Sequence, residues 1–439
     1  MRIAHRIREF SGTHRARLTY LEEPDIASRR SFRVSQAALL VESPSGTDAR
    51  SLRRRSLGGA CLAHALHDGY TDLLYVLLPV WQAEFGLGYA GLAVLRSLYY
   101  ATMGGLQVPA DRLAARLPIR VSLGLSTLVA AAGFGVMALS GGLTGLCCGL
   151  VLAGIGASIQ HPRASLLVAQ AYGGSARGPL GIYNFSGDLG KSLFPVLVAL
   201  LLGLLAWRPV VGLMAGIGIA VTLVLAGLLP PGGLAEAGPR EQRAGSRSSG
   251  FGLLMTVGAL DTATRMGTLL FLPFLLEAKG GTGTTTGLAL ALVFAGGAFG
   301  KAVCGWLGDR LGVLPCVVAT ETATALLVAT LLVLPLGPTL LLLPLVGVVL
   351  NGTSSVLYGT VPDLAPRGEV GRAFALFYTA VIGSGGLAPI AYGFLGDAAG
   401  PAVGLLAAAG TALLTVPLVL GLRRPLATAA QDRPRTSTA

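Results

Sequence analysis

Four ionisable residues lie within nine positions of one apolar stretch, and their spacing places them on one broad face of a helix. They are His64, His67, Asp68 and Asp72. An aspartate beside a histidine can bind and release a proton, because the imidazole tunes the proton affinity of the carboxylate. In the alternative interpretations the histidines satisfy backbone or loop groups and one aspartate is structural, or the set binds zinc or iron. The sequence offers no clear fourth ligand, so we expect no metal site.

A second polar group lies in another apolar run. Asn184, Asp188 and Lys191 follow one another at i, i+4 and i+7 on one helical face. Gly187 and Gly190 in the same run allow a neighbouring helix to come close. The spacing predicts a pair between Asp188 and Lys191. Either Lys191 holds an anionic group of a substrate while Asp188 exchanges a proton, or the two form a structural ion pair.

Further charged residues interrupt two other apolar runs. Asp261 and Arg265 are one helical turn apart, which predicts either a structural ion pair or a substrate contact. Arg96 shares a helical face with Tyr99 and Tyr100, an arrangement that can stack an aromatic or anionic ligand. In the alternative interpretation Arg96 extends to the membrane interface.

The elements that position these residues are predicted to be membrane-spanning helices. The 439-residue chain is 53% hydrophobic and only 12% charged, whereas soluble proteins carry about 25% charged residues. The apolar runs are continuous, which excludes a membrane β-barrel with its alternating strands. A charge at mid-membrane costs about 2.5–3.5 kcal/mol, so the charged residues must face a protein interior or a wet cavity. The five cysteines lie in or beside apolar runs without CxxC spacing, and we interpret them as core residues.

Twelve apolar runs are long enough to cross a membrane, which takes about 20 residues. They begin near Leu57, Tyr89, Val121, Leu143, Pro179, Pro209, Phe251, Thr284, Leu314, Pro338, Glu369 and Pro401. The polar stretch 230–250 is rich in Gly, Pro, Ser and Arg and is predicted to link two six-helix halves, 57–229 and 251–422. We expect residues 1–56, with twelve Arg, to be a disordered tail that contacts anionic lipid, and residues 423–439 to be a second tail.

Arginines concentrate in alternate loops, on the same side as the N-terminus. They are Arg53, Arg54, Arg55, Arg112, Arg116, Arg120, Arg177, Arg240, Arg243, Arg247, Arg310, Arg367, Arg423 and Arg424. Basic residues near span ends stay in the cytoplasm, so we expect both termini there and the protein in the cell (inner) membrane. The formal net charge of +12 lies largely in these loops and the tail, and we expect no nucleic-acid binding.

The two predicted halves carry the same motif in the same place. An Asp-Arg-Leu triplet follows the second apolar run at 111–113 and the eighth at 309–311, an offset of 198 residues. Its charged members are Asp111, Arg112, Asp309 and Arg310. At the starts of the fifth and eleventh runs, Arg177 and Arg372 each precede a tyrosine by six residues. We infer two parallel repeats of one six-helix unit.

At this point the chain resembles the major facilitator superfamily of secondary transporters, because Gly305 to Gly312 match its loop signature G-x-x-x-D-R-x-G. Within the superfamily, three stretches are similar to the fosmidomycin-resistance type of exporter. They read HALHD at 64–68, GIGASIQHPRAS at 154–165 and NFSGDLGK at 184–191. That type tends to have Asn where Asp188 stands and a small residue where Lys191 stands.

The resemblance implies alternating access between the two halves and a cytoplasmic gate built from the Asp-Arg motifs. By the pseudo-symmetry of the superfamily, we expect Asp111 to contact the start of the eleventh span near Arg372. We likewise expect Asp309 to contact the start of the fifth span near Arg177. An aspartate near a helix N-terminus is stabilised by the macrodipole. Arg112 and Arg310 belong to the same gate.

Three further charged residues take their expected places from the same resemblance. Arg163 follows Pro162, which bends the fourth span, and is expected to face the cavity or the gate. Lys301 is expected at the gate or at an interface, and not as a ligand. Glu321 lies in the ninth span, which packs at the periphery in this superfamily, so it is left out of the predicted site.

Residue chemistry and resemblance together predict a proton-coupled exporter of a small organic solute or drug. There is no phosphate-binding loop of the GxxxxGK[ST] type, so an ion gradient should supply the energy. A nucleophile with a base is also not found, and we expect neither an enzyme nor a cofactor. The expected partners are the solute, protons and membrane lipid, and the protein is expected to be monomeric. Two alternatives remain: proton-coupled uptake of an organic anion or metabolite, and a carrier-like membrane sensor or assembly protein.

Overall fold

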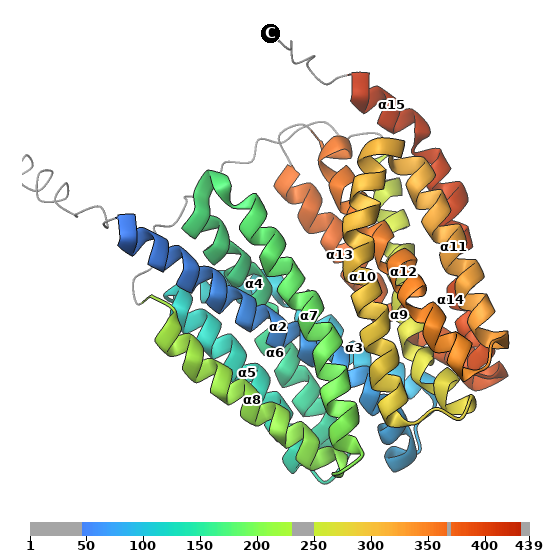
Figure 1. Ribbon diagram of the computed structural model, residues 1–439, viewed down its shortest axis with the longest axis horizontal. Coiled ribbons are helices and arrows are strands. Elements are labelled where there is room, and N and C mark those ends of the chain that lie inside the picture. The colour runs from blue at the N-terminus through green and yellow to red at the C-terminus, as the bar shows by residue number, and fades with distance from the viewer. Residues whose placement is uncertain (1–45, 231–249, 367–369, 432–439) are drawn as a thin grey trace, which may run out of the picture. The chain divides into compact units, whose positions relative to one another are not determined.

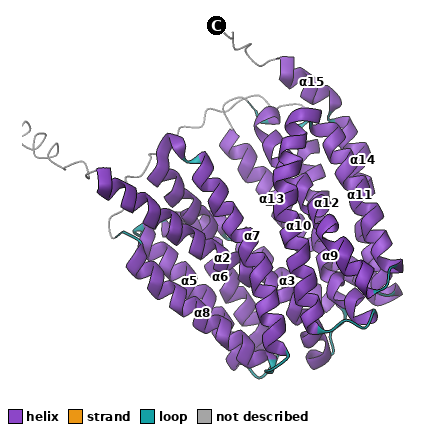
Figure 2. Cartoon of the chain, viewed as in Figure 1, coloured by secondary structure: helices purple, strands orange, loops and turns teal. Residues whose placement is uncertain are grey.

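The computed structural model describes residues 46–230, 250–366 and 370–431. The chain forms two compact units, residues 1–50 and residues 51–439. Of the first unit only the five residues that open the first helix are described. Within the described ranges every regular element is a helix, and none is a strand (Figure 2). The all-α architecture predicted from the apolar runs is therefore confirmed.

The helices fall into two sequence halves, blue to green and yellow to red in Figure 1. The first half contains α2 (Gly46–Phe85), α3 (Tyr89–Gly105), α4 (Gln107–Ala114), α5 (Ile119–Leu139), α6 (Leu143–Tyr172), the 3₁₀ turn Gly173–Ser175, α7 (Arg177–Leu202) and α8 (Trp207–Leu228). The second half contains α9 (Phe251–Ala278), α10 (Gly283–Leu311), α11 (Val313–Val333), α12 (Leu336–Leu364), α13 (Val370–Ala399), α14 (Pro401–Gly421) and α15 (Arg423–Gln431).

Eleven of the twelve predicted spans begin within two residues of the expected position, and the exception is the first. Helix α2 begins at Gly46 and not near Leu57. Residues 46–56 are thus helical, not disordered as predicted, because Ala, Leu and Arg favour a helix and no proline interrupts them. Residues 1–45, and residues 231–249 of the predicted linker 230–250, lie outside the described residues.

Among the described residues, ten of the twelve long helices are apolar and long enough to cross a membrane. The other two are α3, with 17 residues, and α2, which carries the ionisable group of His64 to Asp72. Large apolar side chains face outward, for example Leu139 (90% exposed) and Leu341 (84% exposed). Helix faces with such exposed apolar side chains are compatible with contact to lipid hydrocarbon and not with contact to water.

Glycines let neighbouring helices pack with their backbones in contact. A β-carbon at Gly296 of α10 would lie 2.0 Å from the Pro344 carbonyl oxygen, and one at Gly347 of α12 would lie 2.1 Å from that of Val293. Between α5 and α6, a β-carbon at Gly156 would lie 2.4 Å from the Ala130 nitrogen. Small residues at helix interfaces are the usual basis of packing in membranes, where lipid provides no hydrophobic drive.

The two sequence halves meet where α3 packs against α13 and where α7 packs against α10. Helix α3 runs from Tyr89 towards the arginine-rich loop that contains α4. We call the end with α4 the basic end and the end with Tyr89 the opposite end. The ion pairs and rings of the candidate site lie between these ends.

At the opposite end, a carboxylate of one half caps a helix of the other. Gly88 precedes α3 and offers no side-chain cap. Asp397 of α13 takes this role: its Oδ1 accepts a hydrogen bond from the Tyr89 nitrogen at 2.5 Å, and its Oδ2 from the Ala90 nitrogen at 3.1 Å. The carboxylate satisfies free N–H groups and lies at the positive end of the helix dipole. This cap joins α13 to α3.

We expect Asp397→Ala to favour separation of the halves at the opposite end. Loss of a helix cap costs about 0.5–2 kcal/mol, which corresponds to a shift of up to about 30-fold in a two-state equilibrium. Spin labels at Leu87 and Ala399 should report a larger population of long distances. Asp397→Asn retains one acceptor oxygen and should give a smaller shift. An unchanged distance distribution in Asp397→Ala would show that the cap does not hold this end together.

Candidate functional site

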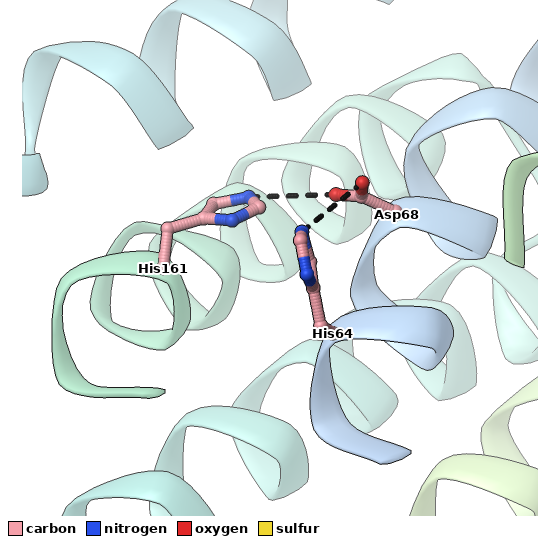
Figure 3. Close-up of side chains that lie close together, drawn as sticks. All are labelled: His64, Asp68 and His161. Carbon is pink, nitrogen blue, oxygen red and sulfur yellow. Dashed lines mark ion pairs between the residues drawn. The ribbon is translucent and has the colours of Figure 1, made fainter. Parts of the chain in front are cut away.

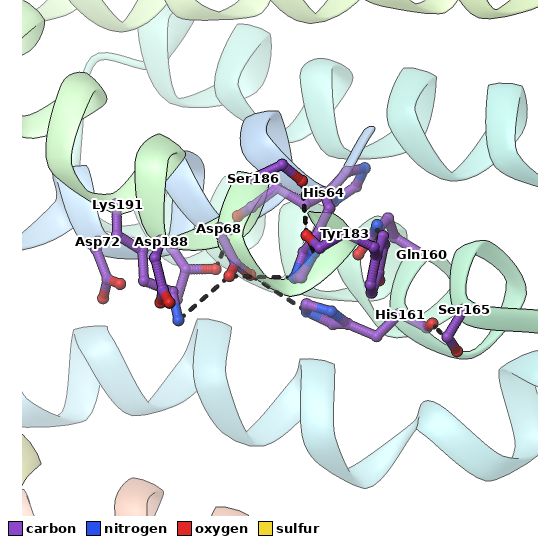
Figure 4. A network of polar contacts seen from close by, with 12 residues as sticks. His64, Asp68, Asp72, Gln160, His161, Ser165, Tyr183, Ser186, Asp188 and Lys191 are labelled. Carbon is purple, nitrogen blue, oxygen red and sulfur yellow. Dashed lines mark hydrogen bonds and ion pairs between the residues drawn. The ribbon is translucent and has the colours of Figure 1, made fainter. Parts of the chain in front are cut away.

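Asp68 is the centre of a buried cluster that draws on three helices. Its Oδ2 lies 3.2 Å from His64 Nε2 and 3.2 Å from Lys191 Nζ, and its Oδ1 lies 3.6 Å from His161 Nε2. Figure 3 shows the two histidines directed at the carboxylate, and Figure 4 shows Lys191 on its other side. Helix α2 supplies His64 and Asp68, α6 supplies His161, and α7 supplies Lys191. One carboxylate thus contacts three nitrogen groups.

Two glycines of α7 make this cluster possible. A β-carbon at Gly190 would lie 1.9 Å from the Ala65 carbonyl oxygen, and one at Gly187 would lie 2.5 Å from Asp68 Oδ2. Any larger residue at either position would force α7 away from α2. This is the close helix contact that the glycine spacing predicts, and it brings Lys191 within reach of Asp68.

The nitrogen that His64 directs at Asp68 has no hydrogen in the neutral ring. His64 Nδ1 lies 2.9 Å from the carbonyl oxygen of Tyr183, whose ring also stacks on the imidazole at 4.0 Å. A carbonyl oxygen can only accept, so Nδ1 must donate. In a neutral imidazole Nε2 then has no hydrogen, yet it faces a carboxylate oxygen. The contact is a hydrogen bond only when a proton is added, either to the imidazole or to Asp68.

Two of the nitrogen groups around Asp68, those of His161 and Lys191, leave the cluster partly open. The side chains of His161 and Lys191 are each 26% exposed, whereas that of Asp68 is 9% exposed. The rings of His161 and His64 meet edge to face at 5.2 Å. Water can therefore reach the cluster beside its buried carboxylate, as a site that exchanges protons requires.

The same side chains give only a poor fit to a metal ion. Donor atoms of His64, Asp68 and His161 lie within 4.8 Å of one another. The ammonium group of Lys191, however, already lies 3.2 Å from the carboxylate oxygen that would bind the ion. A cation there would be repelled by Lys191 and would lose part of its ligand charge. The absence of a metal site therefore stays our prediction.

Two residues predicted for the site point elsewhere. His67 is fully buried, and its Nε2 lies 3.3 Å from Thr127 Oγ1 on α5, away from Asp68. This contact agrees with the structural interpretation of that histidine. Asn184 is exposed, although Asp188, one turn later on the same helix, is buried.

The lysine pairs differ from the pairing predicted within α7. Lys191 contacts Asp68 at 3.2 Å, and Asp188 contacts Lys301 of α10 at 2.6 Å. The predicted pair between Asp188 and Lys191 is thus replaced by two pairs between helices. The reason is reach, because a lysine stem can bridge to a neighbouring helix once glycines bring that helix close. Lys301 lies at the interface between halves, as expected.

Arg96 is buried with too few hydrogen-bond acceptors. It is 4% exposed, so it does not extend to the membrane interface. One guanidinium nitrogen lies 3.5 Å from Asp72 Oδ1, and the group lies over the rings of Tyr75 and Tyr100 at 4.8 and 5.1 Å. Among the described residues, none of its three guanidinium nitrogens finds a hydrogen-bond partner. Such donors would be satisfied by a ligand that brings acceptor oxygens.

In the second half, Asp261 and Arg265 do not form the predicted pair. Arg265 donates instead to Thr262 Oγ1 at 3.3 Å, so the predicted pair with Asp261 is not the contact that forms. Asp261 and Glu321 of α11 are both deeply buried, at 4% and 2% exposure. Glu321 was predicted to lie at the periphery. Its side chain is instead buried, because α11 turns it inward.

The Asp-Arg loop of the first half is held by a residue of the same half. Arg163 is buried, donates to the carbonyl oxygens of Ala114 and Leu117 at 2.7 and 3.2 Å, and lies 4.0 Å from Asp111. It fixes the end of α4 beside Asp111 of the predicted gate, and its role at the gate or the cavity stays a prediction.

The predicted gate contacts between the halves remain predictions. Arg372 is exposed on α13 and has a partner of its own, and the side chains of Arg177 and Asp309 lie outside the described residues. Arg112 lies in the last turn of α4. Arg310 lies in the last turn of α10 and stacks on Trp306 at 4.3 Å.

Several residues of the site were missed as members of it. His161, Tyr183 and Lys301 belong to other helices than Asp68, and no spacing within one helix links them to it. Glu321 had a usable signal, since a lone carboxyl in an apolar span must find an internal partner.

Comparison with known proteins agrees with this architecture. The family model described as the Major Facilitator Superfamily matches residues 60–257 and again 254–438. The fosmidomycin resistance protein of Escherichia coli (strain K12) is 27% identical over 169 residues, 37% of this chain and 42% of that protein. The match thus spans about two fifths of that relative's length.

Two solved structures share the fold. A bacterial homologue of the human lysosomal transporter Spinster, inward-facing and unoccupied, has a TM-score of 0.67 at 16% identity, covering 87% of this chain and 97% of that one. A POT family transporter in complex with a thioalcohol-conjugated peptide has a TM-score of 0.69 at 13% identity, covering 85% and 96%. With the family model matched in both halves, the chain belongs to the major facilitator superfamily and is a multi-pass membrane transporter.

Proposed function

We propose that the protein is a proton-coupled secondary transporter that exports a small organic solute by alternating access. In this proposal it lies in the cell (inner) membrane with both termini and the basic end in the cytoplasm. The observation that carries the proposal is the contact between His64 Nε2 and Asp68 Oδ2, which becomes a hydrogen bond when a proton is added, because His64 Nδ1 donates to Tyr183. Lys191 lies 3.2 Å from the same oxygen.

Competition for one carboxylate provides the coupling. When Asp68 is ionised, Lys191 is its counter-ion at 3.2 Å. Export against an inward proton flow requires that solute and proton compete for Asp68: the ionised carboxylate can accept a hydrogen bond from a donor group of the solute, and the protonated carboxyl group has lost that charge. Proton binding and solute binding then oppose each other through the charge of Asp68, and this linkage acts in both directions.

The solute is proposed to carry an acidic group next to an aromatic or other flat portion. Arg96 supplies buried donors that lack acceptors, and Tyr75 and Tyr100 flank it. A carboxylate or phosphonate offers several acceptor oxygens to a guanidinium fork. The Escherichia coli relative bears the name of a drug-resistance protein, which supports export as the direction.

The test is made in a pump-deficient bacterial host that expresses the wild type or carries an empty vector. Both strains are exposed to fosmidomycin and to a panel of anionic and cationic compounds. We expect resistance to at least one anionic compound, and in everted vesicles the same compound should dissipate a pre-formed pH gradient. Higher sensitivity would indicate uptake of that compound. No change in either assay, with the protein in the membrane, would favour the sensor or assembly alternative.

Uptake of an organic anion or metabolite is the second candidate, favoured by the same unpartnered donors of Arg96. Uptake would use the same side chains, but the solute would move into the cell. Growth on organic anions as sole carbon source, with and without the protein, distinguishes it from export.

We expect Arg96→Lys to weaken recognition of the anionic compound selectively. Lysine keeps the charge but loses the planar fork and the stacking on tyrosine, so half-maximal dissipation should need about 10-fold more compound, or about 1.4 kcal/mol. Cationic compounds should be unaffected. The control is Arg208→Lys at the opposite end, where Arg208 pairs with Glu84 at 2.7 Å and stacks on Trp207. Equal concentration dependence in Arg96→Lys and the wild type would remove Arg96 from the solute site.

A further inference from the structure

A cavity of about 400 Å³ lies outside the candidate site, between the turn that joins α10 to α11, the end of α12, and α15. Successive long helices run in alternate directions, so the ends of α10 and α12 lie at the basic end, as that of α3 does. The lining is mostly apolar and includes Leu311, Val313, Leu314, Pro315, Leu426 and Ala427. Its volume is within the range of small-molecule sites.

Helix α15 is a docked wall of this cavity. Gly250, directly before α9, has a φ of +99°, and a β-carbon there would lie 2.6 Å from Pro425 Cβ of α15. Leu422, directly before α15, is fully buried, and Leu426 and Ala429 pack against the apolar core at this end of the second half. Helix α15 also contacts α12 and α14. The cavity is therefore part of the folded second half.

Arginines without acidic partners surround the apolar lining. Arg423 of α15 lines the cavity, and Arg310 directly precedes the lining residue Leu311. Both arginines are exposed, and neither forms an ion pair with a described side chain. Asp363 is the acidic residue of the lining, and it has a partner of its own. Two free guanidinium groups beside an apolar cavity suit a ligand with an anionic head and an apolar body.

The outer face of α10 next to the cavity has the character of a membrane interface. Trp306 is 52% exposed and Leu311 is 61% exposed. The guanidinium group of Arg310 lies over the Trp306 ring at 4.3 Å. Exposed tryptophans of membrane proteins gather at the level of the lipid headgroups, and arginines there direct their charge to the same level. The two arginines therefore lie where lipid phosphate groups lie.

We propose that this cavity binds an acidic phospholipid of the leaflet at the basic end. The anionic head pairs with Arg310 and Arg423, the apolar lining takes the glycerol backbone, and the acyl chains pass Trp306 on the outer face of α10. A zwitterionic lipid gains less, because its own ammonium group already accompanies the phosphate. A free phosphate has no apolar part to fill the cavity. The inference goes beyond the proposed function and depends on neither the solute nor the direction of transport.

The test is the quenching of Trp306 fluorescence by brominated lipid, with the full-length protein in phosphatidylcholine vesicles. The chain has three tryptophans, and Trp81 and Trp207 are only 0% and 5% exposed. Quenching by bromine on acyl chains thus reports lipid at Trp306, and Trp306→Phe gives the background. We expect half-maximal quenching at a mole fraction of brominated phosphatidylglycerol about 25-fold lower than that of brominated phosphatidylcholine, about 5-fold for each arginine.

Neighbouring residues of α15 provide matched controls. Arg423→Gln should lower the preference for phosphatidylglycerol about 5-fold, whereas Arg424→Gln removes the same charge outside the lining and should change it less than about 2-fold. Ala427→Phe fills the cavity and keeps every charge, and it should lower the preference at least as much as Arg423→Gln. Thr428→Phe, also outside the lining, should leave it unchanged.

Three outcomes would overturn the lipid site. One is equal quenching of the wild type by the two brominated lipids. Another is an equal loss of preference in Arg423→Gln and Arg424→Gln, which would indicate diffuse attraction to a charged surface. The third is displacement of brominated phosphatidylglycerol by soluble glycerol phosphate, which would show that the headgroup alone suffices. None of these measurements involves transport, so the result is independent of the proposed function.

Discussion

Asp68→Asn is expected to abolish proton-driven transport, with the initial rate of gradient dissipation falling by about 100-fold or more. Asp68 is the carboxylate that His64, His161 and Lys191 all contact. Removing one partner of a buried ion pair costs about 3–5 kcal/mol, because the remaining charge is left uncompensated. The rate is measured in everted vesicles with a compound that the wild type transports.

A double variant separates the chemistry of Asp68 from its structural role. Asp68→Asn with Lys191→Met removes both charges, and we expect it to regain most of the thermal stability that the single variant loses. Transport should stay lost, because neither the carboxylate that binds the proton nor the ammonium group of Lys191 is present. A double variant with proton-driven transport near the wild-type rate would show that the pair only locks α2 to α7.

Gly347→Ala is expected to cause a large loss of folded protein. A β-carbon there would lie 2.1 Å from the Val293 carbonyl oxygen, and a backbone carbonyl cannot move aside as a flexible side chain can. Overpacking a tight interface typically costs about 1–3 kcal/mol, and we expect a cost of about 3 kcal/mol here. The yield of monodisperse protein in detergent and its melting temperature are the measurements.

The matched control lies on the same helix. Gly359 is also within α12, but a β-carbon there would meet nothing within 4 Å. Gly359→Ala should leave the yield unchanged or raise it, because alanine favours a helix over glycine. If both variants behave alike, backbone contact between α10 and α12 does not determine stability.

The sequence predicted the helices well because each span needs a continuous apolar run, which is a local property. Eleven starts agree within two residues, and α2 differs because arginine-rich segments are also good helix formers. Membrane burial also identified Asp68, Arg96 and Asp188 as interior residues.

The partners of those residues could not be predicted in the same way. Helical spacing finds neighbours on one helix, and it therefore suggested Asp188 with Lys191 and Asp261 with Arg265. Long side chains instead reached other helices, as in the pairs of Lys191 with Asp68 and Asp188 with Lys301. Which helices touch depends on packing between segments far apart in the sequence. Glu321 was misjudged because a helix at the periphery can still direct one face inward.

The two lysine pairs have a consequence for communication between the halves. Asp188 and Lys191 are one turn apart on α7, so Asp188 lies close to two ammonium groups although it bonds only Lys301. When a proton neutralises Asp68, Lys191 is left with Asp188 as its next carboxylate. Lys301 would then share or lose its counter-ion, and the link between α7 and α10 would weaken. Protonation of Asp68 in the first half would thus affect the second half through an exchange of ion-pair partners. No deformation of the backbone is needed for this coupling.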